Sequence, residues 1–199
     1  MAWIQHIPVD VQELYEIHDY HHAAAILAVE FPTEFDEILE VLRSFRIRTS
    51  DLTKPGGNES NIPKLISSVL RPLGWEESNL HASMVVDGQT IHSDTHKVDY
   101  IKKRVAFDLE WNSKDQTFDR DLFAFRSFHD YGRISVGVLL TRSAELNPVF
   151  KGLGIPKKYG AATTWMGKLL PRLDAGRGGG CPILVFGITP RLIADLNQE

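Results

Sequence analysis

Residues 98–114 carry the side chains whose types and spacing are best suited to chemistry. Their sequence, VDYIKKRVAFDLEWNSK, predicts two short strands joined by a tight basic turn near Lys103. Because side chains alternate between the two faces of a strand, Asp108 and Glu110 are expected to point the same way. Antiparallel pairing around the turn places Asp99 opposite Asp108. The sequence therefore predicts that three carboxylates converge on an otherwise apolar strand.

Carboxylates grouped in this way are costly to bury, because like charges repel and desolvation disfavours each anion. A hard divalent cation with oxygen ligands, Mg²⁺ above all, is the usual compensation. A solvated sheet edge, where an Arg or Lys neutralises each acid, explains the same spacing equally well. On spacing alone, both a magnesium site and a charged surface remain open.

The rest of the chain predicts an α/β fold around this hairpin. Residues 115–131 read as a helix and residues 134–140 as an apolar strand, and this order favours a crossover between parallel strands. We therefore expect one domain over residues 1–199, with a mixed central β-sheet flanked by helices. Further elements are predicted as follows: strands at 9–17 and 182–188, helices at 20–30, 32–45, 62–73 and 164–173, a hairpin within 75–96 that turns at Asp87-Gly88, and loops at 46–61, 147–159 and 176–180.

Composition excludes several classes of protein. An apolar content of 43% and a charged content of 24% are ordinary for a soluble globular protein. No apolar run approaches the ~20 residues that a membrane span needs, and the N-terminus lacks the basic and apolar regions of a signal peptide. A single cysteine, Cys181, excludes an internal disulfide and fits a reducing cytoplasm. We expect a cytoplasmic protein without a membrane partner.

The charge of the chain is unevenly distributed. The net charge of −4 does not by itself indicate a nucleic-acid partner. Residues 1–50, however, hold nine acids and three basic residues, whereas residues 142–199 hold eight basic residues and four acids. A basic face opposite an acidic one can attract a polyanion, although this asymmetry is weak evidence alone.

Four segments and their order along the chain indicate a family: VDYIKKRVAFDLEW, FDRDLFAF, GRISVGVLL, and GRGGGCP followed by ILVFGITP. In these segments the chain resembles the type II restriction endonucleases of the BglII/BstYI group. The resemblance covers the second half of the chain well and the N-terminal helices loosely. These enzymes share the PD-(D/E)xK nuclease fold, whose signature is an acid, a variable gap and then acid-x-Lys. Because acid-x-acid patterns are common, the ordered segments are the more specific signal.

The resemblance implies a catalytic role for each of the three acids. Asp99 takes the place of the first metal-binding acid, and Asp108 takes a place usually held by Glu. Glu110 stands where the signature has Lys and the resembled group has Gln; this resembles the BamHI arrangement, in which an acid acts on the attacking water. The backbone carbonyl of Leu109 would be a further ligand of Mg²⁺, the implied cofactor. Lys114 is a candidate either for the missing cation or for a phosphate contact.

The resemblance further implies a homodimer that cuts double-stranded DNA at a palindrome, with a GATC core in the resembled group, and leaves 5′-phosphate ends. A cognate DNA methyltransferase would be its functional partner. A catalytically inactive DNA-binding relative, an enzyme that depends on modified bases, and a structure-selective repair nuclease remain alternatives. Side chains expected to contact bases or phosphates, for which a solvated loop position is an equal alternative, are Arg48, Lys54, Asn112, Ser113, Lys114, Asn147, Lys157 and Lys158.

Overall fold

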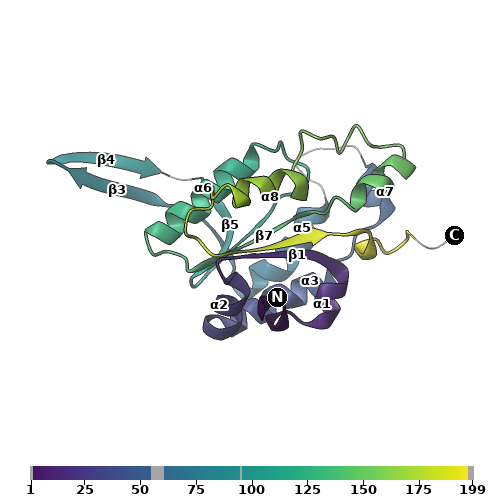
Figure 1. Ribbon diagram of the computed structural model, residues 1–199, viewed down its shortest axis with the longest axis horizontal. Coiled ribbons are helices and arrows are strands. Elements are labelled where there is room, and N and C mark those ends of the chain that lie inside the picture. The colour runs from purple at the N-terminus through teal and green to yellow at the C-terminus, as the bar shows by residue number, and fades with distance from the viewer. Residues whose placement is uncertain (1, 55–60, 95, 197–199) are drawn as a thin grey trace.

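The computed structural model describes residues 2–54, 61–94 and 96–196, which form a six-stranded mixed sheet with helices on both faces (Figure 1). The strand order is β1-β8-β7-β6-β5-β2. Strands β6, β7 and β8 are parallel, and β1, β5 and β2 pair with their neighbours in the antiparallel sense. The bounds of the strands are Tyr15–Tyr20 (β1), Glu76–Ser78 (β2), Val98–Lys102 (β5), Val105–Leu109 (β6), Val136–Arg142 (β7) and Ile183–Ile188 (β8). The predicted α/β fold with a mixed sheet is confirmed.

Two apolar layers hold the helices against this sheet. Helices α6 and α8 cover one face, and α1, α2 and α3 cover the other (Figure 1). In β6, Val105, Phe107 and Leu109 face the layer of the N-terminal helices, while Ala106 faces the layer of α6. The helices are α1 Val9–Leu14, α2 Ala23–Glu30, α3 Pro32–Ser44, α4 Thr49–Thr53, α5 Asn61–Leu70, α6 Thr117–Asp130, α7 Leu146–Gly152 and α8 Met166–Asp174. In the described part of the chain, no helix is long and apolar enough to cross a membrane.

The hairpin of β5 and β6 forms as the sequence predicts. Tyr100 pairs with Phe107, and Lys103 occupies the tight turn with a positive φ of 50°. Every residue of β6 is buried. The chain then crosses over through α6 to β7, which pairs with β6 in parallel, as expected from the strand–helix–strand order. The carboxyl ends of β6, β7 and β8 consequently lie at one edge of the sheet, the usual location of ligand sites in parallel sheets.

A second hairpin, β3 (His81–Val86) and β4 (Gln89–Asp94), projects from the body of the protein (Figure 1). Its turn at Asp87 and Gly88 has positive φ at both residues, the conformation that an Asp-Gly pair favours between two strands. The hairpin predicted within residues 75–96 is therefore confirmed. Met84, Val85 and Ile91 on it are exposed.

Three predicted elements were wrong in part. Residues 9–14 form helix α1 rather than a strand, and the strand begins only at Tyr15. The helix is favoured because Val11 packs into the core and the Gln12 side chain donates hydrogen bonds to the Ile4 and Ile7 carbonyls. The loop expected at 147–159 begins with helix α7, whose residues Leu146 and Phe150 are buried. The loop expected at 46–61 contains α4, and its residues 55–60 lie outside the described part of the chain.

Candidate active site

The start of β5 and the end of β6 place two carboxylates side by side. Asp99 and Asp108 flank the Tyr100–Phe107 pair, which ends the ladder between the two strands, and the Asp99 backbone N–H donates a 2.7 Å hydrogen bond to Asp108 Oδ1. The Asp108 side chain is buried on the α6 face of the sheet, and Asp99 is accessible to solvent. Between Asp108 and Glu110, the Leu109 side chain packs into the opposite apolar layer, so only its main chain is available to the site.

Glu110 follows β6 directly, and neighbouring strand β7 fixes its backbone. Its N–H donates to the Leu140 carbonyl at 2.9 Å, and its carbonyl accepts a hydrogen bond from Thr141 Oγ1 at 2.8 Å. The ladder between β6 and β7 thus extends one residue beyond the strand. The half-buried Glu110 side chain hydrogen-bonds to Ser113 and lies within the field of Asp99. The three predicted acids are brought together.

A fourth carboxylate, Asp121 of α6, belongs to the cluster and was not among the predicted site residues. Asp121 is 4% exposed and hydrogen-bonds to Glu110. A signal was present, because Asp121 lies three residues after Phe118 and four before Phe125, both of which are buried. An acid on the apolar stripe of a helix needs a partner, and here that partner belongs to a different element.

The protein environment of these four acids raises the pKa of each of them. Desolvation, followed by the charges of Asp121 and Asp99, raises the pKa of Asp108 well above its ordinary value. Desolvation also raises the pKa of Glu110, with Asp99 adding to the rise. For Asp121, desolvation and then the charge of Glu110 raise the pKa to about 9. The protein packed around Asp99 raises its pKa too, and Glu77 contributes. The site cannot hold four negative charges without a proton or a cation.

The donor chemistry of the cluster suits a divalent cation. Asp108 Oδ2, Glu110 Oε2 and Asp121 Oδ2 are buried and, within the described residues, have no hydrogen-bond partner. Buried oxygens of this kind are normally satisfied, and hard carboxylate oxygens are the ligands of Mg²⁺. Among the described residues, no group of three or more His, Cys, Asp or Glu side chains is arranged so that it could hold a metal ion. The carboxylates fit the ion by type of ligand but not by their arrangement in this structure.

The segment after Glu110 carries three of the predicted DNA contacts. Asn112 has a φ of 126°, donates its backbone N–H to Thr164 Oγ1 at 3.1 Å, and has a buried Oδ1 without a partner in the described residues. The Ser113 carbonyl accepts a hydrogen bond from the Thr164 N–H at 2.9 Å, and the backbone of Lys114 forms an isolated antiparallel β-bridge with Thr163. The side chains of Ser113 and Lys114 are exposed beside the carboxylates. Residues 112–114 are thus pinned at the site by the chain before α8.

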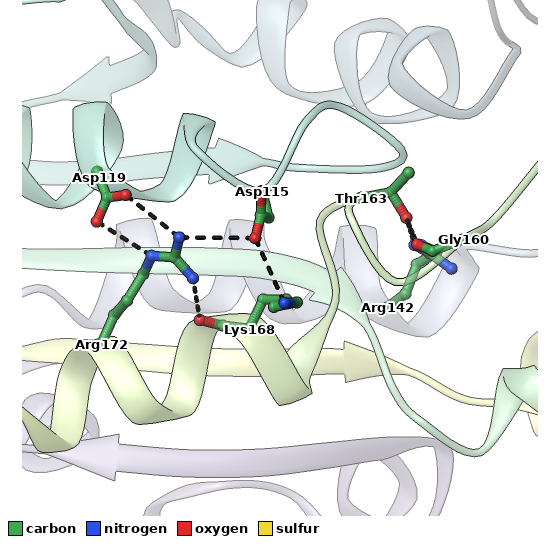
Figure 2. A network of polar contacts seen from close by, with 7 residues as sticks. All are labelled: Asp115, Asp119, Arg142, Gly160, Thr163, Lys168 and Arg172. Carbon is green, nitrogen blue, oxygen red and sulfur yellow. Dashed lines mark hydrogen bonds and ion pairs between the residues drawn. The ribbon is translucent and has the colours of Figure 1, made fainter.

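Polar contacts with α8 fix residues 115–119, which follow directly and include the start of α6 (Figure 2). Arg172 of α8 donates two hydrogen bonds to Asp119, at 3.0 and 3.2 Å, and its guanidinium lies 3.8 Å from Asp115. Lys168 lies 3.6 Å from the same Asp115 carboxylate. Because α6 also carries Asp121, this clamp positions one wall of the carboxylate cluster.

The other predicted DNA contacts lie on separate elements. Lys158 Nζ donates to the carbonyls of Leu52, at 2.7 Å, and Lys54, so its ammonium group joins the chain after α7 to the C-terminal end of α4. Arg48 is exposed at the start of α4. Lys54, Asn147 and Lys157 are exposed as well. The structure does not gather these five residues at the carboxylates.

Comparison with known families decides the class of protein. A family model described as restriction endonuclease BglII/BglIII matches residues 15–188. The chain belongs to this family. The match begins at the first residue of β1 and ends at the last residue of β8, so it contains the whole central sheet. A search of curated proteins found no match.

Membership makes the chain a type II site-specific deoxyribonuclease, a hydrolase whose substrate is DNA. The resemblance deduced from the ordered segments is confirmed, and its extent is larger than the sequence suggested, because the N-terminal strand is included. The six-stranded mixed sheet flanked by helices is consistent with the restriction-endonuclease fold.

Proposed function

We propose that this BglII-family enzyme makes Mg²⁺-dependent double-strand cuts at one palindromic DNA sequence and leaves 5′-phosphate and 3′-hydroxyl ends. The observation that supports this most is the cluster of Asp99, Asp108, Glu110 and Asp121, in which three buried carboxylate oxygens have no partner among the described residues. Buried carboxyl oxygens are normally satisfied, and a proton or a cation would satisfy these.

In this proposal Asp99, Asp108 and the Leu109 carbonyl hold Mg²⁺. When bound, the ion polarises the scissile phosphate and lowers the pKa of a water molecule. Glu110 accepts the proton of that water. Its backbone is fixed by β7, and its raised pKa is closer to neutral pH than the pKa of an ordinary Glu, which suits a general base. Asp121 keeps its own proton at neutral pH and donates it in a hydrogen bond to Glu110, which holds the Glu110 carboxylate in the ionised form.

The surfaces next to the cluster supply DNA contacts in this proposal. Asn112 and Lys114 follow the cluster directly and would reach base edges or phosphates, and Ser113 combines such a position with its hydrogen bond to Glu110. A palindrome suits a homodimer, because each subunit reads one half-site. A GATC core and a cognate methyltransferase remain part of the proposal through the resemblance to the BglII/BstYI group.

The test is incubation of unmethylated plasmid DNA with the purified enzyme in Mg²⁺ and in EDTA. Discrete fragments that need Mg²⁺ and carry ligatable 5′-phosphate ends are expected, and sequencing of the ends gives the recognised sequence. Asp108→Asn should leave the plasmid intact, whereas Asp130→Asn, an exposed acid on the same helix as Asp121, should cut normally. Specific binding without cleavage in Mg²⁺ or Mn²⁺ would refute the proposal in favour of an inactive DNA-binding relative.

A further inference from the structure

A pocket of about 240 Å³ lies beyond the carboxyl end of β7, apart from the carboxylate cluster. Its volume is below the ~300–1,000 Å³ of pockets for drug-sized ligands, so it fits a single heterocycle rather than a larger molecule. Aromatic side chains form much of its wall, and an exposed amide stands at its rim. The lining residues are Asn147, Phe150, Pro156, Tyr159, Gly160, Ala161 and Trp165.

A buried cation makes the wall of this pocket rigid. Arg142, 1% exposed at the end of β7, has its guanidinium carbon 5.0 Å from the centre of the Tyr159 ring and 5.4 Å from that of Phe150. These two rings are stacked with centroids 4.0 Å apart. The guanidinium also donates to the Thr164 carbonyl. It donates to Thr163 Oγ1 as well, which lies beside it in Figure 2. The guanidinium thus ties the two rings to the chain before α8.

The pocket and the carboxylate cluster share one edge of the sheet. Trp111, the residue after Glu110, contacts Tyr159 edge to face with centroids 6.0 Å apart. The Asp115 N–H donates to the Ala162 carbonyl at 3.0 Å, so the chain that lines the pocket is bonded to the segment that leaves the active site. Phe150 and Tyr159, two of the residues that line the pocket, belong to the apolar layer of the N-terminal helices. DNA lying across this edge of the sheet would extend from the carboxylate cluster toward the pocket.

We infer that this pocket receives one base of the bound DNA, rotated out of the duplex stack. The inference rests on the proposed function, since it needs a DNA duplex held across the carboxylate cluster. An unstacked base is a flat heterocycle that stacks on aromatic rings, and its polar edge requires a donor and an acceptor. Half-buried Trp165 offers a ring, while Phe150 and Tyr159 line the pocket as buried rings stacked on each other. The exposed Asn147 amide offers both a donor and an acceptor. Exposed Lys157 beside Pro156 is placed to hold the adjacent phosphate.

Photochemical cross-linking to duplexes of mixed sequence tests this inference, because such a pool contains the recognised sequence whatever it is. In the probes, 5-iodouracil, 5-iodocytosine, 8-bromoadenine or 8-bromoguanine replaces its parent base, and the duplexes are bound in Ca²⁺ in place of Mg²⁺. After irradiation, mass spectrometry locates the attached peptide. Ala161→Leu fills the pocket from an exposed position, and Ala162→Leu is the matched control, because Ala162 is also exposed but does not line the pocket.

The expected result is attachment of one analogue to Tyr159 or Trp165, lost in Ala161→Leu and kept in Ala162→Leu. Loss of one base–aromatic stack should also weaken binding of the duplex by about 10-fold in Ala161→Leu. Attachment only outside the pocket, with duplex binding intact, would overturn the inference and leave the proposed nuclease standing. Absence of duplex binding altogether would overturn both, and the plasmid assay identifies that case independently.

Discussion

Replacing Asp121 by Asn should stabilise the metal-free enzyme against unfolding, although Asp121 lies in the functional cluster. An Asn amide has the same shape and can donate the hydrogen bond that protonated Asp121 gives to Glu110. It requires no proton for burial. Wild-type protein, in contrast, must bind a proton at Asp121 on folding, because desolvation and the Glu110 charge raise its pKa to about 9.

The sign and the size of this effect follow from the two proton affinities. Between the ordinary value of 3.8 and the raised pKa of about 9, the folded state holds a proton that the unfolded chain has released. Stability is therefore full below the unfolded pKa and falls by about 1.4 kcal/mol for each pH unit above it. At pH 7 this would cost about 4 kcal/mol, and we expect Asp121→Asn to recover roughly 2–4 kcal/mol because Glu110 shares the titration.

Urea unfolding in EDTA at pH 5.5, 7.0 and 8.5, followed by tryptophan fluorescence, measures the effect. The gain in free energy of unfolding should grow with pH in Asp121→Asn and be absent in Asp130→Asn, whose carboxylate is exposed. If the wild type and Asp121→Asn show the same dependence of stability on pH, Asp121 is not buried as a protonated acid and the account of the cluster fails.

Three further predictions concern the metal and the packing. Mg²⁺ at 100 times its Kd should stabilise the wild type by about 2.7 kcal/mol in the same urea assay, and an equal gain in Asp108→Asn would exclude Asp108 as a ligand. Gly137→Ala should cost about 1–3 kcal/mol, because the new Cβ would lie 2.5 Å from the Phe125 ring; a thermal midpoint equal to that of the wild type would contradict this. Arg172→Met should lower the free energy of unfolding by about 1–2 kcal/mol, because it removes the hydrogen bonds to Asp119. Arg126→Met, which breaks only an exposed ion pair, should lower it by less than about 0.5 kcal/mol. Equal losses in the two variants on thermal unfolding would argue against the clamp.

Local patterns in the sequence predicted what is local in the fold. The pairing of Asp99 with Asp108 follows from a turn near Lys103 and the alternation of strand side chains, and both hold in the structure. The Asp-Gly turn of the second hairpin was predicted for the same reason, since two residues determine its backbone conformation.

Contacts between segments that are distant in the sequence could not be predicted from local patterns. Asp121 joins the cluster because α6 packs over β6, which no spacing within residues 98–114 reveals. Helix α7 forms because Phe150 packs against Tyr159 and Arg142, so its stability comes from tertiary contacts that override the Pro and Gly signals of its sequence. The wrong strand at residues 9–14 has the same cause, since a short period-two pattern also fits one buried helical turn.

The central claim, that Asp99, Asp108 and Glu110 form the nuclease centre, is tested most directly by single-turnover cleavage of the recognised duplex in Mg²⁺. Asp99→Asn, Asp108→Asn and Glu110→Gln should each cut at least ~10²-fold more slowly than the wild type while binding the same duplex in Ca²⁺, and Asp130→Asn should match the wild type. Cleavage by Asp108→Asn at the wild-type rate would place the chemistry elsewhere and contradict the account.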